Sequence, residues 1–180
     1  GDFGENIVYN QLMHYFPQSV IDDVSGTTAK GDLLWKMNDE TFKCLVEVKN
    51  VQHVRPSDIQ KFERDIQING ENGSCNCGLF VSLKTETIPS KGKFHFEFIR
   101  NMPILYVSNV YEDLETLRLA FQIILNIQNC VLVKQHDNMS QDEQHAIIEL
   151  VHSLHSKLQR SLKNINSMKL ISFKSLILIF

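Results

Sequence analysis

The succession of apolar patterns with different periods is the feature that most constrains the fold of this chain. Apolar residues recur at helical spacing over residues 4–16, and Pro17 ends that pattern. A second helical pattern, which begins at Pro56, separates the third strand pattern from the fourth. A helix, three strands, a helix and a strand in this order predict a mixed α/β sheet domain. The four strand patterns cover residues 19–24, 32–37, 42–48 and 78–83.

The C-terminal part of the chain changes from strand patterns to helical ones. Two further strand patterns, the second of which ends at Ser108, are followed by helical patterns that begin at Leu114 and near Ser140. We therefore predict a core over residues 1–108 and a C-terminal helical extension over residues 109–180. The apolar stripe of the longer helix has near-heptad spacing. Packing on the core and a helix–helix contact in a dimer both explain such a stripe.

Charge and cysteine usage limit the classes of protein to which this chain can belong. A formal net charge of −3 and a pI near 6.2 argue against a protein that coats nucleic acid through a broad basic surface. Residues 1–50 contain eight acids against four lysines, and a Mg²⁺ site draws on such carboxylates. The four cysteines form no paired zinc pattern, so we expect reduced thiols and an intracellular location, cytoplasmic or nuclear.

No segment is expected to cross a membrane, so we predict no membrane partner. The most apolar stretch, Leu170 to Phe180, is interrupted by Ser172, Lys174 and Ser175. It is shorter than the roughly 20 residues that a helical span needs. A buried terminal strand or helix explains this stretch, and an oligomer contact is the alternative.

One predicted strand ends in the charged triplet Glu47-Val48-Lys49, fifteen residues after Asp32. Alone, such a triplet has about an even chance of occurring in a chain of this length. Glu47 and Lys49 are two residues apart on a strand, so both side chains leave the same face of the sheet. Asp32 opens the preceding strand of the predicted hairpin, and Glu5 lies on the helix before it. Together they supply three carboxylates and one ammonium group.

This set of residues suits the hydrolysis of a phosphodiester. Mg²⁺ or Mn²⁺ takes hard oxygen ligands, which Asp32, Glu47 and the Val48 carbonyl could supply. A bound metal lowers the pKa of its water and neutralises charge that develops on the phosphate. Lys49 could orient that water, help to deprotonate it or stabilise the transition state, with Glu5 supporting the site.

The order of these residues resembles the core of the PD-(D/E)XK nuclease superfamily. The helix with Glu5, Gly31-Asp32, Glu47-Val48-Lys49 and the strand from Cys77 to Ser82 match its restriction-endonuclease-like αβββαβ arrangement, closest to the Holliday-junction resolvase-like and Mrr-like branches. The resemblance covers roughly residues 1–108, and Gly31 stands where the motif has proline. It implies a mixed central sheet. Because many such nucleases act as dimers, we also expect a homodimer through the C-terminal helices.

A small-residue loop precedes Asp32 and is a candidate for contact with nucleic acid. Its backbone N–H groups and hydroxyls could grip a DNA phosphate at the mouth of the site. An ordinary solvated turn explains the same composition equally well. The candidate nucleic-acid-binding residues in this loop are Ser25, Thr27, Thr28 and Lys30.

Three polar residues flank the apolar stripe of the helix that begins at Pro56. In the nucleases that this chain resembles, polar residues on this helix often assist the site or contact phosphate. We therefore expect Gln60 to assist catalysis and Lys61 and Arg64 to bind nucleic acid. A solvated helix face is the alternative.

The function that these expectations favour is a Mg²⁺- or Mn²⁺-dependent DNA endonuclease that leaves a 3′-hydroxyl and a 5′-phosphate. A catalytically inactive nucleic-acid-binding or assembly module with the same fold is a second hypothesis. The low pI favours this module, and the complete Asp/Glu/Lys set argues against it. An RNA endonuclease is a third hypothesis, because the same chemistry cleaves either nucleic acid.

Overall fold

The computed structural model describes residues 2–26, 31–133 and 139–177, and it divides into two compact units, Gly1–Gln144 and His145–Phe180. The described residues form six strands and four helices. Their order along the first part of the chain is helix, three strands, helix and strand, as the apolar patterns predict. The elements are α1 (Asp2–Tyr15), β1 (Val20–Asp23), β2 (Leu33–Lys36), β3 (Lys43–Lys49), α2 (Pro56–Glu71), β4 (Cys77–Ser82), β5 (Phe94–Ile99), β6 (Met102–Val107), α3 (Leu114–Val133) and α4 (Gln141–Ile177).

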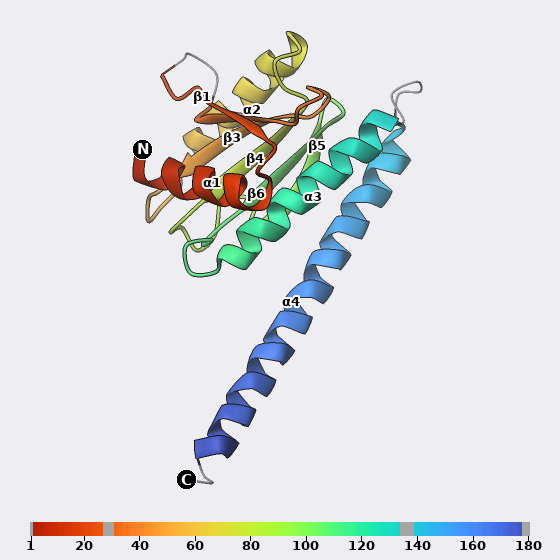
Figure 1. The fold of residues 1–180 in the computed structure, drawn as a ribbon. Helices are drawn as coiled ribbons and strands as arrows, with labels where there is room; N and C mark the ends of the chain where they lie inside the picture. Colours follow the sequence, from red (N-terminus) through yellow and green to blue (C-terminus); the bar gives the residue numbers. More distant parts are fainter. Residues whose placement is uncertain (1, 27–30, 134–138, 178–180) are drawn as a thin grey trace. The chain divides into compact units, whose positions relative to one another are not determined.

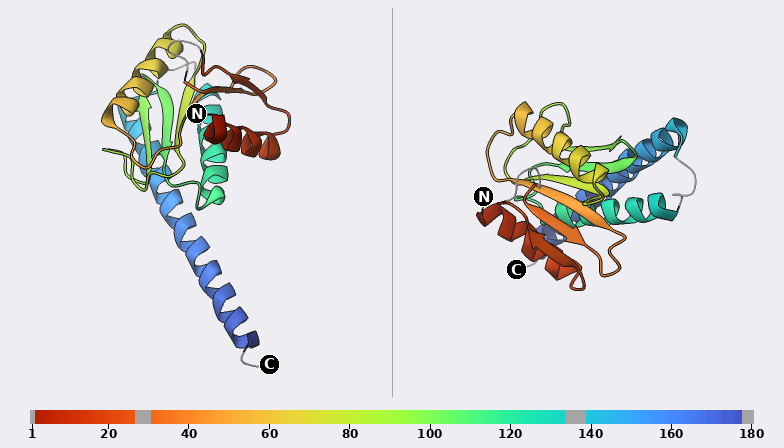
Figure 2. Two further views of the ribbon diagram at one scale, coloured as in Figure 1. Left: turned by 90° about the vertical axis from the view of Figure 1, so that its left-hand side faces the viewer. Right: turned by 90° about the horizontal axis from the view of Figure 1, so that it is seen from above.

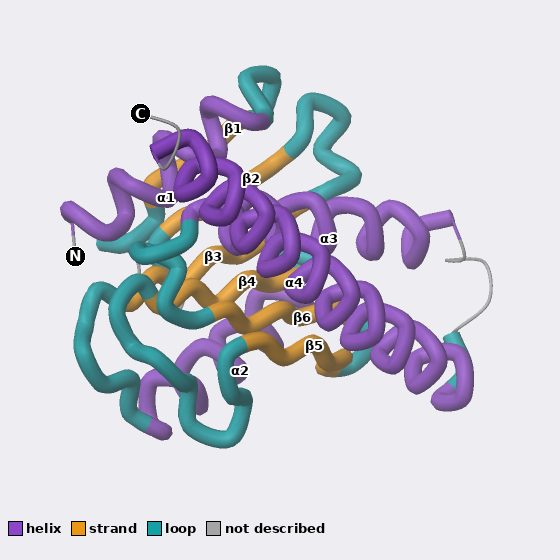
Figure 3. The backbone as a smooth tube through the Cα atoms, turned by 90° about the horizontal axis from the view of Figure 1, so that it is seen from below, coloured by secondary structure: helices purple, strands orange, loops and turns teal. Residues whose placement is uncertain are grey.

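The six strands form one mixed sheet in the order β1-β2-β3-β4-β6-β5, which can be followed in Figure 3. The three central strands β3, β4 and β6 are parallel to one another, and the strands outside them pair antiparallel. This finding confirms the mixed α/β sheet domain that we expect from the sequence. Because β3 and β4 run in the same direction, the helix α2 between them crosses one face of the sheet.

The helices of the first unit cover the sheet on both faces, with α2 on one and α1 and α3 on the other (Figures 1 and 2). On the α2 face, Phe62 and Ile66 pack on Leu45, Phe80 and other buried residues of the sheet. The helix comes so close to β4 that a Cβ at Gly78 would lie 2.4 Å from Ile66 Cδ1. This close contact holds α2 against β3 and β4 and so fixes the side chains that it presents to β3.

An aromatic cluster fills the opposite face of the sheet. Trp35 of β2 is fully buried, and its ring lies 5.1 Å from that of Phe16 and 5.7 Å from that of Phe121 in α3. Its indole N–H donates to Ser19 Oγ at 2.8 Å, so the buried polar atom of the ring is satisfied. Burial of each such side chain contributes about 1.5–3 kcal/mol, and the cluster anchors the β2–β3 hairpin.

Helix α3 corrects one expectation from the sequence. By length and composition alone, Leu114–Val133 could cross a membrane, which the expectation that no segment could serve as a span overlooked, whereas the absence of a membrane partner stays a prediction. Its residues Leu117, Phe121 and Ile124 are fully buried, and it packs on β4, β6 and α1. The helix is apolar because it covers the sheet, and through it the first unit extends beyond residue 108 to Gln144.

The second unit consists of most of α4. A capping box is present at the start of this helix, because Glu143 N–H donates to Ser140 Oγ and Ser140 N–H to Glu143 Oε2. The helix continues to Ile177, so it includes most of the apolar C-terminal stretch. Residues 178–180 lie outside the described residues.

Candidate functional site

Asp32 and Glu47 lie close together at the end of the β2–β3 hairpin. Leu33 pairs with Val46 in the ladder, and the Asp32 N–H also donates to the Val46 carbonyl, at 3.0 Å. Asp32 therefore lies beside Val46, just before β2 begins and next to Glu47 in β3. Side chains alternate between faces along a strand, so Glu47 projects on the same side of β3 as Leu45.

The carboxylate of Asp32 is held by the backbone of β3. Its Oδ2 accepts a hydrogen bond from the Val48 N–H at 2.7 Å. The carbonyl of the next residue, Lys49, accepts from Leu83 N–H on the β4 side of the strand. Because the N–H and C=O of one strand residue point to the same side, the Val48 carbonyl points with its N–H toward Asp32. The three predicted oxygen donors, from Asp32, Glu47 and Val48, therefore lie at one end of the hairpin.

Glu47 is a buried carboxylate with two cations on one of its oxygens. Its side chain is 1% exposed, and Oε1 lies 2.6 Å from Lys49 Nζ and 3.7 Å from Lys61 Nζ. The other oxygen, Oε2, is also buried and has no hydrogen-bond partner among the described residues. Buried carboxylate oxygens are rarely left in this state, because the cost of losing water is then uncompensated. Oε2 is thus the oxygen of Glu47 that remains for a ligand.

Burial, and repulsion by a neighbouring acid, raise the pKa values of both carboxyl groups. Burial is the largest cause for Asp32, opposed by the Val48 hydrogen bond, and the charge of Glu5 raises its pKa further. For Glu47, burial is again the largest cause, and the charge of Asp32 adds to it. Both acids are therefore harder to ionise than in water, and a nearby cation would favour their charged forms. Glu5 of α1 belongs to this group of charges, and it also lines a small cavity of about 210 Å³ beside Leu33.

Lys49 is held in its protonated form. Burial alone lowers its pKa, but the hydrogen bond and charge of Glu47 outweigh that effect, so the pKa of Lys49 is raised. Asp32 and Asp58, at the start of α2, act in the same direction. Its side chain is 23% exposed, so the ammonium group reaches the surface. In this arrangement Lys49 can donate hydrogen bonds and supply positive charge, and it is poorly suited to accept a proton.

Helix α2 contributes Lys61 and Asp65 to the site. Lys61 Nζ lies 3.7 Å from Glu47 Oε1 and 3.4 Å from Asp65 Oδ2, and Asp65 is fully buried. Arg64, which is largely exposed, reaches the other oxygen of Asp65 at 3.3 Å. Gln60, the predicted catalytic residue of this helix, is exposed. Asp65 has no place in the sequence prediction, although it lies four residues from Lys61 and beside the apolar Ile66.

The loop before Asp32 is only partly described. Ser25 is exposed, and both its N–H and its hydroxyl donate to Asp23 Oδ1, at 3.0 and 2.6 Å. These bonds form a local turn at the end of β1 that lowers the pKa of Asp23. Thr27, Thr28 and Lys30 lie outside the described residues, so their predicted contact with nucleic acid stays a prediction.

Cysteine and histidine add no ligands to this site. Within residues 2–26, 31–133 and 139–177, no three His, Cys, Asp or Glu side chains are grouped as a metal site. Cys44, Cys75 and Cys77 are free and buried, and burial raises the pKa of Cys75 to about 12. Such thiols stay protonated and are poor ligands. A metal at Asp32 and Glu47 would have two protein carboxylates, and Mg²⁺ commonly binds one or two carboxylates and completes its shell with water and phosphate.

A second cluster of charged side chains lies on the other flank of α2, and its members form ion pairs with one another. Lys91 Nζ lies 2.9 Å from Glu63 and 2.5 Å from Glu97, above the ring of Tyr106. Burial raises the pKa of Glu97, but hydrogen bonds from His95 and Lys91 outweigh it and bring the value to about 2. The cluster joins α2 to β5 and β6, and its charges satisfy one another.

Comparisons of this chain with protein-family models, with curated proteins and with solved structures found no match.

Proposed function

We propose that this protein is a divalent-metal-dependent endonuclease that hydrolyses phosphodiester bonds in DNA, with a restriction-endonuclease-like core. One observation carries the proposal: Asp32 and Glu47 lie close together beside two lysines, Lys49 and Lys61, at the end of a buried strand. Structural ion pairs are usually balanced, whereas here the buried Glu47 and the half-buried Asp32, both with raised pKa values, share one end of a hairpin. Such perturbed groups cluster at functional sites.

The residues of the site fit Mg²⁺ or Mn²⁺. Glu47 Oε2 is buried without a hydrogen-bond partner among the described residues, and it can bind a cation while Oε1 keeps its pair with Lys49. Asp32 uses Oδ2 for the Val48 N–H, which leaves Oδ1. Asp32, Glu47 and the Val48 carbonyl would hold the metal, and hard oxygen donors are what these ions take.

Each residue then has a distinct part in the reaction. The metal, when bound, lowers the pKa of a water and offsets negative charge on the phosphate. Lys49, protonated by virtue of Glu47, donates hydrogen bonds to the phosphate oxygen that gains charge. Lys61 adds a second positive charge, and Asp65 fixes its position. Glu5 acts on the site through its charge, which raises the pKa of Asp32.

A nuclease-like module without activity is the alternative from another class. It would bind nucleic acid through Lys61 and Arg64 and would have no need for an unsatisfied Glu47 oxygen. An RNA substrate is compatible with the same residues, because the chemistry at phosphorus is shared.

Calorimetric titration with Mn²⁺ separates an enzyme from the module. The full chain is expected to bind Mn²⁺ with a measurable heat, and Asp32→Asn is expected to weaken binding at least tenfold, or about 1.4 kcal/mol. Asp39→Asn, in the exposed turn between β2 and β3, is the matched control and should bind like the unaltered chain. No binding by the unaltered chain, or equal binding by Asp32→Asn, would contradict a metal site at these residues.

A further inference from the structure

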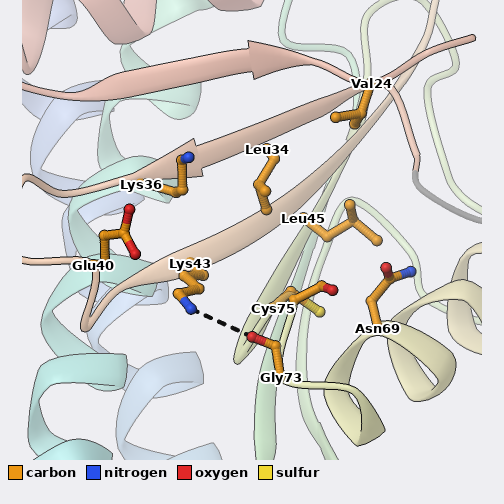
Figure 4. Close-up of a pocket in the computed structure, with 10 residues that line it drawn as sticks. Val24, Leu34, Lys36, Glu40, Lys43, Leu45, Asn69, Gly73 and Cys75 are labelled. Atoms are coloured by element: carbon orange, nitrogen blue, oxygen red, sulfur yellow. Dashed lines mark hydrogen bonds between the residues drawn. The ribbon is translucent and has the colours of Figure 1, made fainter. Parts of the chain in front are cut away.

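A cavity of about 300 Å³ lies on the α2 face of the sheet, between the β2–β3 hairpin and the C-terminal part of α2 (Figure 4). Its floor is apolar and includes Leu34 of β2, Leu45 of β3 and Cys75. Its volume is at the lower end of the roughly 300–1,000 Å³ that small-molecule sites occupy. The cavity would therefore accept a single planar ring and little more.

The cavity begins directly beside the proposed catalytic pair. Leu34 and Leu45 are partners in the ladder, and Glu47 follows Leu45 on the same face of β3, with Asp32 close to it. Two residues along a strand span about 6.6–6.8 Å. On α2, Asn69 of the cavity likewise follows Asp65 of the site by one helical turn. The cavity is thus about one nucleotide away from the place where a scissile phosphate would bind.

The rim of the cavity combines fixed polar groups with a cation. The Asn69 amide projects from α2 toward the strands (Figure 4), and its Nδ2 donates to the Asp65 carbonyl at 2.7 Å. Ser74 lies on the loop that follows the helix. Lys43 Nζ makes a long contact, 3.4 Å, with the Gly73 carbonyl and has no carboxylate partner among the described residues. Glu40 and Lys36 also line the cavity, and Lys36 is paired with Asp22. An apolar floor and a polar rim that carries Lys43 suit a heteroaromatic ring attached to a phosphate.

We propose that this cavity is a subsite for an unpaired nucleobase of the strand that is cut, with Lys43 on the adjoining phosphate. The inference rests on the proposed function and specifies its substrate class, which is single-stranded or locally unpaired nucleic acid. A base in a duplex is stacked and paired, so it must leave the stack before it can enter such a cavity. The free energy needed to unstack and unpair a base is smaller in single strands, bulges and mismatches, so we expect the protein to prefer these substrates.

Fluorescence of 2-aminopurine tests the proposal without any cleavage. The full chain is mixed, in EDTA, with short single-stranded DNA that carries 2-aminopurine at one position at a time. We expect one or two neighbouring positions to brighten on binding, because the base leaves its stacked neighbours. Ser74→Phe, which fills the cavity, is expected to abolish this signal and to weaken binding about tenfold. Asn126→Phe, an exposed position on α3, is the matched control and should behave like the unaltered chain.

A second variant keeps the test decisive if Ser74→Phe fails to fold. Lys43→Gln is expected to weaken binding and to reduce the slope of log K against log salt by about 0.7, the value for one phosphate on a single strand. Titration with free adenosine monophosphate distinguishes a site for a free nucleotide from a subsite for a base of a nucleic-acid strand. Strong binding of adenosine monophosphate would overturn the proposal that the cavity binds a base of the strand. A signal that persists in a folded Ser74→Phe chain, no brightening at any position, or an unchanged salt slope in Lys43→Gln would also overturn the inference.

Failure of this inference and failure of the proposed function give different results. A chain that cleaves DNA but shows no cavity-dependent fluorescence keeps the nuclease proposal and loses the subsite. A chain that shows the fluorescence change and never cleaves, with Mg²⁺ or Mn²⁺ present, keeps a nucleobase cavity and loses the nuclease.

Discussion

The Asp32 carboxylate accepts a hydrogen bond from the Val48 N–H at 2.7 Å, and in doing so it replaces the strand partner that β3 lacks at this point. Strand β2 begins only at Leu33, so the N–H of Val48 would otherwise face an open end of the ladder. A side chain that completes a backbone ladder is fixed in position, which is how a metal ligand should be held. The same bond places Asp32 close enough to Glu47 for its charge to raise the pKa of Glu47.

The first prediction concerns stability and pH. Because burial raises the pKa of Asp32, its ionised form destabilises the folded protein above that pKa, and the cost fades as the pH falls toward the unfolded value of about 3.9. Asp32→Asn keeps an acceptor for the Val48 N–H and removes the charge. We expect this variant to have a higher Tm than the unaltered chain at pH 8, with the difference shrinking toward pH 4.

Thermal melts at several pH values between 4 and 8 check this prediction. Asp39→Asn, in an exposed turn, is the control and should show no such gain. A lower Tm for Asp32→Asn at pH 8, or a gain that is the same at every pH, would show that Asp32 is not a destabilising buried charge.

The second prediction distinguishes two neighbouring residues of α2. Lys61 contacts Glu47 and Asp65, whereas Gln60 is exposed. Lys61→Gln is therefore expected to lower kcat/KM about tenfold, or about 1.4 kcal/mol, and Gln60→Ala to change it less than twofold. Initial rates on one labelled substrate measure both. The reverse order of effects would support the catalytic role of Gln60 that the family resemblance implies.

The third prediction concerns Asp65, which is fully buried and pairs with Lys61. Asp65→Asn removes the charge that positions Lys61, so we expect kcat to fall several-fold while KM changes little. Loss of a buried partner also costs stability, typically 1–3 kcal/mol. Kinetics and chemical unfolding on the same preparation separate the two effects. An unchanged kcat in a folded Asp65→Asn chain would assign Asp65 to stability alone.

The fold was easier to predict from the sequence than the site. Helix α2 begins at Pro56 as expected, and the order of the elements is as predicted, because apolar period and proline are local signals. The proximity of Asp32 and Glu47 could be predicted because a short hairpin brings the outer ends of its two strands together. Asp65 could not be predicted as a member of the site. Its role depends on how closely α2 approaches β3, and a sequence pattern does not give that distance. The cavity beside Leu34 and Leu45 is likewise a product of packing between distant segments.

The fourth prediction concerns self-association, which the sequence suggests through its near-heptad stripe. Leu150, Leu154, Leu158 and Ile165 of α4 are 39–58% exposed. We expect light scattering after size exclusion to give twice the chain mass of 20.8 kDa, and Leu154→Glu with Leu158→Glu to give the monomer. A monomeric mass for the unaltered chain at micromolar concentration would exclude a stable dimer through this stripe.

Cleavage itself is the most direct test of a metal-dependent nuclease. The full chain is incubated with supercoiled plasmid, single-stranded DNA, mismatched duplex and RNA, each with Mg²⁺, Mn²⁺ or EDTA. Lys49→Met is assayed beside it, with Lys93→Met, an exposed lysine paired to Glu86, as the control for lost charge. We expect products with a 5′-phosphate and a 3′-hydroxyl from the unaltered chain and from Lys93→Met with metal, and a rate at least a hundredfold lower from Lys49→Met. Absence of cleavage on every substrate, or equal cleavage by Lys49→Met, would contradict the assignment of Asp32, Glu47 and Lys49 as a nuclease site.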